Sequence, residues 1–406
     1  MYAKKMNYAE RNIVEVKEHI ERLHGDSKGF ITLASKNNGN YKQWHYKTED
    51  IENNEEEIIE SINSYISQNT FYRPQRRIEN IKELKALYID LDVYNTKYTK
   101  EGVIYFLEND LYGIIPRPNL IIDSGRGLYY VILIEAVPSM ALPLWYAVQR
   151  FLYDNLKEYG ADVKALDPTR ILRIPGTVNS KSNSTVRILD YYDYNYTLRE
   201  IQDNYLPDLK VKKEKKKGRP KKIVSLYTEY SLYHSRLIDI AKLCELRDYD
   251  LKGHRELILF LYRYYSCSFI QDEIEALDKV LELNNMFREP LSIKEVERDT
   301  KSAERYYIEK KYKYTNERLI ELLEITEYEQ QNLKSIIGKK EKYRRNNERR
   351  KATRRNEKGQ TKRDIEKIEK IKVIKELFKK GYKQKDIARE LNVTKGTVSK
   401  YLKINL

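Results

Sequence analysis

Two aspartates, Asp90 and Asp92, flank Leu91 at the end of the apolar stretch 84–94 (LKALYIDLDVY). Alternate residues of an extended strand point to the same face, so both carboxylates are predicted to share a face, with Cα atoms roughly 6.6 Å apart. Carboxylates at this spacing can ligate one or two divalent ions, and a pair of ions stabilises the attacking and leaving oxygens in phosphoryl transfer. A lone Asp-x-Asp is more often only the polar end of a strand, so the pair needs support from other motifs.

A glycine turn, Ser124-Gly125-Arg126-Gly127, lies between two apolar stretches. Glycine permits positive φ angles and lets backbone N–H groups approach an anion closely, and Arg126 adds positive charge. The same residues are equally compatible with a tight hairpin that binds nothing.

A third motif, residues 167–181 (DPTRILRIPGTVNSK), carries a carboxylate and three cationic side chains around a Pro-Gly turn. The forked guanidinium groups of Arg170 and Arg173 suit phosphate oxygens, and Lys181 adds a third positive charge. Asp167 could complete a metal site. Alternatively, the arginines are surface charges and Asp167 is a turn residue. The presence of three such motifs in one region favours the chemical interpretation.

These side chains must be positioned by a mixed set of elements. Residues 28–46 predict two short strands around an Asn-Asn-Gly-Asn turn, residues 84–94 predict a buried strand, and residues 118–134 predict two strands joined by the glycine turn. Apolar residues at helical spacing follow over 140–159. Strands that alternate with helices up to about residue 205 predict one α/β (α+β) domain built around a sheet.

The net charge of +15 is concentrated in two segments. Residues 211–222 carry eight basic side chains and one acidic, and residues 339–363 carry thirteen and three. Basic patches of this kind usually bind polyanions. A membrane partner is not expected, because no stretch approaches the ~20 apolar residues of a span. Two cysteines, Cys244 and Cys267, form no disulfide framework or zinc motif, which predicts a reducing, cytoplasmic location.

The motifs YIDLD, SGRGLYY and DPTRILRIPGTVNSK, in that order, resemble the archaeo-eukaryotic primase superfamily. The likeness is strongest to the primase-polymerase branch in replication proteins of Gram-positive, in particular clostridial, plasmids, and it covers about residues 25–205. It implies an RRM-like catalytic sheet and a nucleotidyltransferase that uses Mg²⁺ or Mn²⁺. The resemblance assigns the metal to Asp90, Asp92 and Asp167, with Asp162 as the alternative third acid. It assigns the triphosphate of the incoming nucleotide to Ser124, Arg126, Arg170, Arg173 and Lys181.

One position departs from the family pattern. Many members carry a histidine two residues after the second glycine of the turn, where it contacts the nucleotide, and this chain has Tyr129 there. Tyrosine can donate a hydrogen bond to phosphate, but it is not cationic at neutral pH. The departure implies weaker catalysis or an altered nucleotide preference.

The region after the catalytic domain is predicted to be helical. Residues 253–303 resemble the small helical domain that follows the catalytic core of such primases and is thought to assist primer initiation, and the most specific part of the likeness is residues 285–296. Thr326 followed by Glu329 predicts a capping box at the start of another helix. In the basic linker, residues 217–220 (KGRP) resemble an AT-hook core in which Arg219 enters a narrow minor groove. A plain charged linker is the more common explanation of such a sequence.

The C-terminal sequence predicts a helix-turn-helix. Residues 384–391 form the first helix of the motif, Asn392 takes the left-handed turn, and Thr394 caps the second helix. The side chains expected to face a major groove are Lys395, Thr397, Ser399 and Lys400. The alternative is a three-helix module that binds another protein.

The predicted order is therefore a primase-like catalytic domain (1–205), a basic linker (206–226), a helical domain (227–310), a helical and highly basic connector (311–365) and a helix-turn-helix (366–406). Such a chain is expected to bind a plasmid origin and to synthesise or extend primers from nucleoside triphosphates on single-stranded DNA. It has no G-x-x-x-x-G-K-[ST] motif, so a host helicase and replicase are expected partners. The alternative is a catalytically silent protein that binds the origin and recruits host enzymes.

Overall fold

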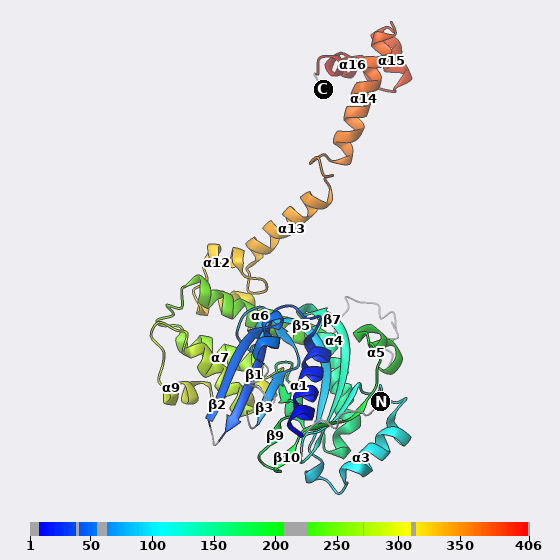
Figure 1. The fold of residues 1–406 in the computed structure, drawn as a ribbon. Helices are drawn as coiled ribbons and strands as arrows, with labels where there is room; N and C mark the ends of the chain where they lie inside the picture. The colour runs from blue at the N-terminus through cyan, green and yellow to red at the C-terminus, as the bar shows by residue number, and fades with distance from the viewer. Residues whose placement is uncertain are drawn as a thin grey trace, which may run out of the picture. The chain divides into compact units, whose positions relative to one another are not determined.

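The computed structural model describes residues 8–37, 40–54, 63–206, 226–270, 272–309 and 314–404. It divides into two compact units, Met1–Ile336 and Ile337–Leu406. Figure 1 shows the elements of both. The larger unit combines a sheet with a helical region, and the smaller unit is helical. This confirms the predicted α+β class, whereas the finer domain boundaries stay predictions.

The core of the larger unit is an antiparallel sheet in the order β11-β6-β7-β5-β4-β1-β3-β8, with β2 paired to β1. Its strands are β1 (Phe30–Asn37), β2 (Asn40–Lys47), β3 (Ser64–Ser67), β4 (Thr70–Phe71), β5 (Ile81–Leu91), β6 (Leu120–Asp123), β7 (Leu128–Pro138), β8 (Ile171–Arg173) and β11 (Arg187–Tyr191). A separate pair, β9 (Val178–Asn179) and β10 (Ser184–Thr185), lies off this sheet. The strands predicted within 28–46, 84–94 and 118–134 are therefore present.

The long strand β5 is buried on both faces. Trp145 of α4 (Leu142–Leu156) donates a hydrogen bond of 2.8 Å to the carbonyl oxygen of Ala86, and its ring packs against Tyr88. Lys85, at an irregularity in the pairing of β5 with β7, is buried and pairs with Asp26 beyond the end of α1 (Tyr8–His24). Helices on both sides thus fix the strand whose end carries Asp90 and Asp92 (Figure 1).

The remaining helices of the larger unit range from 6 to 21 residues in length. Two of them, α3 (Lys100–Phe106) and α5 (Leu198–Tyr205), belong to the sheet region. The helical region contains α6 (Leu226–Leu246), α7 (Arg255–Ser266), α8 (Glu273–Asn284), α9 (Ile293–Thr300), α10 (Ala303–Ile308), α11 (Asn316–Leu322) and α12 (Glu327–Asn332). The predicted capping box of Thr326 and Glu329 is confirmed at the start of α12.

The helical region packs directly on the sheet region. The guanidinium of Arg76, between β4 and β5, lies 2.8 Å from the carboxylate of Glu275 on α8. Tyr262 of α7 donates a hydrogen bond of 3.0 Å to Glu79. These buried polar contacts join two parts of the chain that were predicted as separate domains.

The smaller unit contains α13 (Lys339–Thr353), α14 (Lys362–Lys379), α15 (Gln384–Glu390) and α16 (Lys395–Leu402). The last three helices share a small core of Ile374, Ile387, Ala388 and Val398. Asn392 has a φ of 49°, and the Thr394 side chain accepts a hydrogen bond from the backbone N–H of Thr397. The predicted turn and cap are both confirmed.

Some predictions concern residues that the structure does not describe. Residues 207–225, which include most of the basic linker and Arg219 of the AT-hook-like sequence, lie outside the described residues. Within the described part, no helix has both the length and the apolar character needed to cross a membrane. Cys244 and Cys267 are buried and not disulfide-bonded.

Candidate active site

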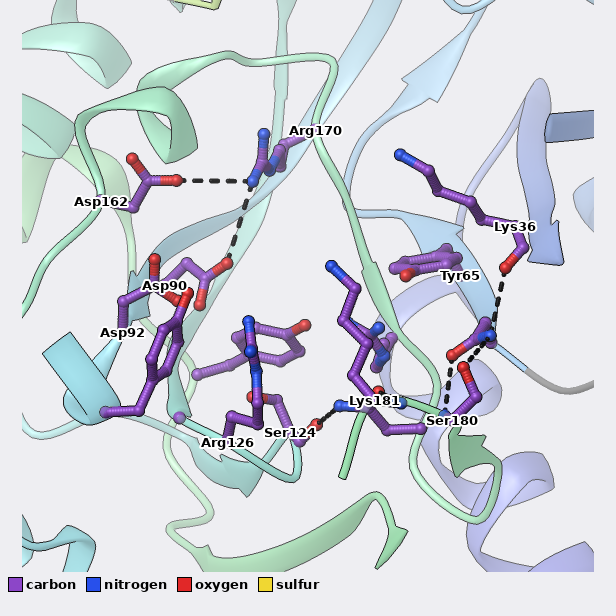
Figure 2. Close-up of a pocket in the computed structure, with 16 residues that line it drawn as sticks. Lys36, Tyr65, Asp90, Asp92, Ser124, Arg126, Asp162, Arg170, Ser180 and Lys181 are labelled. Carbon is purple, nitrogen blue, oxygen red and sulfur yellow. Dashed lines mark hydrogen bonds and ion pairs between the residues drawn. The ribbon is translucent and has the colours of Figure 1, made fainter. Parts of the chain in front are cut away.

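A pocket of about 620 Å³ in the larger unit gathers most of the predicted site residues (Figure 2). Of the nine catalytic and nucleotide-binding residues predicted, eight line it: Asp90, Asp92, Ser124, Arg126, Tyr129, Arg170, Arg173 and Lys181. Asp162, predicted as the alternative third acid, lines it too. Three motifs separated by tens of residues therefore meet at one cavity.

The end of β5 and the segment 160–162 place three carboxylates on one side of the pocket. The backbone N–H of Asp92 donates to the carbonyl oxygen of Gly160, and the N–H of Asp162 donates to that of Asp90, both at 2.8 Å. This short ladder carries Asp162 to the strand end where Asp90 and Asp92 lie. Figure 2 shows the three side chains together.

Burial and neighbouring charges change the ionisation of Asp90 and Asp92. Burial raises the pKa of Asp90 to about 7, and the neighbouring Asp92 and Asp162 carboxylates add to the rise, although Arg170 opposes it. Burial and the Asp162 charge also raise the pKa of Asp92. Such carboxylates gain from a nearby positive charge. The guanidinium of Arg170 supplies one, 3.8 Å from Asp90 and 3.7 Å from Asp162.

Asp167, predicted as the third metal ligand, is not among the residues that line the pocket. It is 1% exposed, and its Oδ1 accepts hydrogen bonds of 2.8 Å from both the backbone N–H and the hydroxyl of Thr169. An aspartate commonly binds the backbone two residues further on, and here it holds the turn that leads to Arg170. Asp162 accepts the N–H of Lys164 in a similar way, at 3.0 Å, but unlike Asp167 it lines the pocket, so the geometry favours Asp162 as the third acid.

The glycine turn is shaped by close backbone packing. A Cβ on Gly127 would lie 2.2 Å from the carbonyl oxygen of Leu91, so only glycine fits between the turn and the end of β5. Gly125 has a φ of +104°, in the left-handed region that favours glycine. The guanidinium of Arg126 stacks over the Tyr94 ring, 4.1 Å from its centroid, beside Asp92. The turn therefore has a structural requirement for both glycines.

Tyr129 and Arg173 form the inner part of the pocket. Tyr129 of β7 lies directly opposite Asp90 of β5 and is 3% exposed. Burial raises the pKa of Tyr129, so its phenol is neutral at physiological pH. Arg173 at the end of β8 packs over Tyr65, 4.8 Å from the ring centroid. At the position where the family has a histidine, the pocket thus holds an uncharged hydrogen-bonding group.

Several residues that line the pocket were not predicted from the sequence: Lys36, Asn63, Tyr65, Tyr94, Asn179 and Ser180. The side-chain amide of Asn63 donates a hydrogen bond of 2.8 Å to the Ser180 hydroxyl, and its Oδ1 accepts the Ser180 N–H at 3.0 Å. Asn179 in turn accepts the N–H of Lys181 at 3.0 Å and donates to the carbonyl of Ser124 at 2.6 Å. These side-chain amides position the loop that carries Lys181. No local motif could have predicted the role of Asn63, because its partner Ser180 lies more than a hundred residues away in the sequence.

The acid cluster suits a hard divalent cation in the type of its ligands. Mg²⁺ and Mn²⁺ prefer carboxylate oxygens, and three carboxylates line one cavity. Within the part of the chain that the structure describes, however, no three Asp, Glu, His or Cys side chains already form a group able to hold an ion. Instead, the positive charge of Arg170 lies between Asp90 and Asp162. Arg170 thus supplies part of the positive charge that an ion would bring to Asp90 and Asp162.

Of the five residues predicted to contact DNA, Arg219 lies outside the described residues and the other four lie in the smaller unit, on α16. Lys395 and Lys400 are exposed, and Thr397 and Ser399 are half-buried. The helix thus presents two exposed lysines, with the smaller polar side chains closer to the helix core.

Comparison with known proteins gives one strong match. No protein-family model matches the chain. Among solved structures, it resembles the AEP domain of the cyanophage S-2L primase-polymerase, with a TM-score of 0.38 and 17% identity over 48% of this chain and 97% of that one. It also resembles primase RepB′, with a TM-score of 0.35 and 13% identity over 72% of this chain and 94% of that one. Likenesses with TM-scores this low carry no functional assignment.

The strong match is to a curated protein named replication protein, from Clostridium perfringens. The two sequences are 58% identical over 327 residues, which make up 80% of each chain. Identity at this level over four fifths of both proteins reflects common descent. The chain therefore belongs to the family of that replication protein, as its motifs predicted.

Proposed function

We propose that the protein initiates plasmid DNA replication, and that its larger unit synthesises or extends primers by metal-dependent nucleotidyl transfer. The observation that supports this most directly is the composition of the pocket. Acidic side chains from β5 and residue 162 line one part of it, and Arg126, Arg173 and Lys181 line another. Nucleotidyl transfer needs this combination, because a polyanionic triphosphate must be held beside a cation-binding cluster.

The acid cluster is the proposed metal site. Asp90, Asp92 and Asp162 would hold Mg²⁺ or Mn²⁺. When bound, such ions lower the pKa of the attacking 3′-hydroxyl and neutralise charge on the triphosphate. The raised pKa values of Asp90 and Asp92 support this assignment: burial and then the neighbouring carboxylates disfavour their charged forms, and a nearby cation favours them.

The cationic residues are proposed to bind and orient the triphosphate. Arg126 and Lys181 come from two loops that are tied together, because Asn179 bonds both the Ser124 carbonyl and the Lys181 N–H. Arg173 is held against Tyr65. Side chains fixed in this way lose little conformational freedom on binding phosphate, which lowers the cost of orienting the nucleotide. The neutral Tyr129 can donate a hydrogen bond to phosphate without adding charge.

The C-terminal unit is proposed to bind the origin. Lys395, Thr397, Ser399 and Lys400 on α16 are the proposed contacts, and the basic helix α13 adds sequence-independent attraction to phosphates. The relative is named a replication protein, which accords with this role. A host helicase and replicase are the proposed partners, because the sequence has no nucleotide-binding loop of the ATPase type.

Primer synthesis by the purified full-length protein tests the enzymatic part of the proposal. The assay uses single-stranded template, labelled NTPs or dNTPs, and Mg²⁺ or Mn²⁺. The wild type is expected to make product, and the Asp90→Ala/Asp92→Ala variant is expected to make none. Asp110→Ala, which removes an exposed carboxylate outside the pocket, serves as the matched control and should retain activity.

The second candidate is a silent origin-binding protein that recruits host enzymes. It is favoured by Tyr129 in place of the family histidine, and by the guanidinium of Arg170 between two of the three acids. The same assay separates the two candidates. No product from the wild type under any metal and nucleotide condition, with origin binding intact, would establish the silent form.

A further inference from the structure

Helix α8 of the helical region forms a wall beside the candidate active site. A second cavity of about 710 Å³ lies between α8 and the sheet, and it shares Asp90, Tyr129, Arg170 and Arg173 with the first. The two cavities therefore meet at the same residues. A charged side chain of α8 that points towards these shared residues is therefore close enough to interact electrostatically with the candidate active site.

The start of α8 is anchored to the segment that carries Asp162. Asp272 caps the helix by accepting the backbone N–H groups of Ile274 and Glu275. Its carboxylate also pairs with Lys164, two residues after Asp162, at 3.0 Å. The first turn of α8 thus has a fixed position relative to the acid cluster, and Glu275 lies in that turn.

Glu275 contacts two arginines of the sheet region. One carboxylate oxygen lies 2.8 Å from Arg76, whose side chain is 5% exposed and also donates to the carbonyl oxygen of Thr169 at 2.6 Å. The other lies 3.9 Å from Arg170. The contact with Arg76 is a close, buried ion pair that holds the carboxylate in place, so its second oxygen stays directed at Arg170.

Arg170 is shared among three carboxylates at nearly equal distances. Asp162 lies at 3.7 Å, Asp90 at 3.8 Å and Glu275 at 3.9 Å from its guanidinium. All three contacts are longer than a hydrogen bond, so none of the acids holds the guanidinium on its own. Two of the three are the proposed metal ligands, and only Glu275 comes from the helical region. Loss of its attraction would let Arg170 move closer to Asp90 and Asp162.

We propose that Glu275 is a positioning residue that draws Arg170 away from Asp90 and Asp162, and so keeps their oxygens available to a divalent ion. The inference rests on the proposed metal-dependent function. It makes the helical region part of the active site rather than an independent module. Arg170 then alternates between neutralising the empty acid cluster and pairing with Glu275 when an ion occupies it.

Direct titration with Mn²⁺, followed by the paramagnetic resonance signal of the free ion, tests this without relying on activity. In full-length protein, Glu275→Gln is expected to raise the Kd for Mn²⁺ several-fold, by at most roughly tenfold, the scale of a partly exposed ion pair. Glu273→Gln removes the same charge from the same helix turn, but its side chain is exposed, and it should leave the Kd unchanged.

Arg76→Gln tests the anchor of Glu275. It breaks the ion pair and lowers the melting temperature, and because the Glu275 carboxylate is then no longer held towards Arg170, the Kd for Mn²⁺ should rise in the same direction as for Glu275→Gln. If Glu275→Gln does not fold, Glu275→Asp keeps the charge but withdraws the carboxylate from Arg170, and it is expected to raise the Kd in the same direction. An unchanged Kd in the folded Glu275 variant would overturn the inference.

The result also distinguishes this inference from the proposed function. A wild type that binds Mn²⁺ but makes no primer contradicts the enzymatic proposal alone, and the effect of Glu275→Gln on the Kd still decides the role of Glu275. A wild type that makes primers, with a Glu275 variant of unaltered Mn²⁺ affinity and nucleotide KM, contradicts the inference alone. A wild type that binds no Mn²⁺ contradicts both.

Discussion

The pocket of the larger unit and helix α16 of the smaller unit both present basic side chains, but they hold them differently. In the pocket, Arg170 lies among carboxylates from three separate segments, and the loop of Lys181 is held by Asn63, more than a hundred residues away. On α16, Lys395 and Lys400 project from a helix whose start is set by its own cap, Thr394. We therefore expect the activity of the pocket to change when residues far away in the sequence are substituted. DNA binding by α16 should change only when exposed residues of that helix are substituted.

The largest expected effect contrasts Asp162 with Asp167. Asp162→Asn removes a carboxylate from the pocket and is expected to lower the rate of primer synthesis by roughly 10²–10³-fold, the scale of losing one electrostatic contact at a reacting centre. Asp167→Asn alters a buried turn instead, so it should mainly lower the melting temperature. Steady-state kinetics and thermal melts of both variants check this. Equal loss of activity in two well-folded variants would contradict the assignment of the third acid.

A smaller effect is expected from Gly127→Ala. The added Cβ would lie 2.2 Å from the Leu91 carbonyl oxygen, so either the turn or the end of β5 must move. Overpacking of this kind typically costs about 1–3 kcal/mol of unfolding free energy. Denaturant titration measures the cost, and the Kd for a labelled nucleotide should rise as well. Gly102→Ala on α3 is the control in the same unit, because the nearest atom to its added Cβ lies at 3.4 Å, and it should not be destabilised.

Substitutions in the C-terminal unit are expected to change DNA binding rather than primer synthesis. Lys395→Ala/Lys400→Ala is expected to weaken origin binding and to reduce the dependence of log K on log salt by roughly 2, because each lost phosphate contact contributes about 0.9. Primer synthesis on single-stranded template should be unaffected. Electrophoretic mobility shifts at several salt concentrations check the slope. An unchanged slope would show that α16 does not contact phosphates.

The smallest expected effect concerns acid stability of the larger unit. His24 is buried and bonds the Ser67 carbonyl oxygen at 2.8 Å, and burial lowers its pKa from 6.5 to about 4. The folded state therefore resists protonation, so the stability that the neutral ring contributes is present above pH 6.5 and is lost as the pH falls towards 4. The difference in unfolding free energy between wild type and His24→Asn should shrink over that window. Residues 337–406 contain no histidine, so the smaller unit should show no such dependence.

Much of the local structure and several site residues could be predicted from the sequence. The apolar stretch predicted the strand β5 and the pairing of Asp90 with Asp92 at its end; both line the pocket, although Asp92 lies one residue beyond the strand, with φ −73° and ψ 63°. The left-handed Asn392 and the Thr394 cap also follow from short-range preferences. These predictions hold because backbone sterics and hydrogen bonds to residues two to four positions away act within the segment itself.

The tertiary structure alone decided which acids and cations meet. The sequence pointed to Asp167 as the third acid and to Asp162 only as the alternative, but a backbone ladder brings Asp162 to the end of β5 while Thr169 engages Asp167. Glu275 approaches Arg170 only because α8 packs on the sheet region. Contacts between residues so far apart in the sequence depend on the tertiary packing of the whole chain. The free energy of that packing is distributed over many residues, so no local sequence motif predicts it.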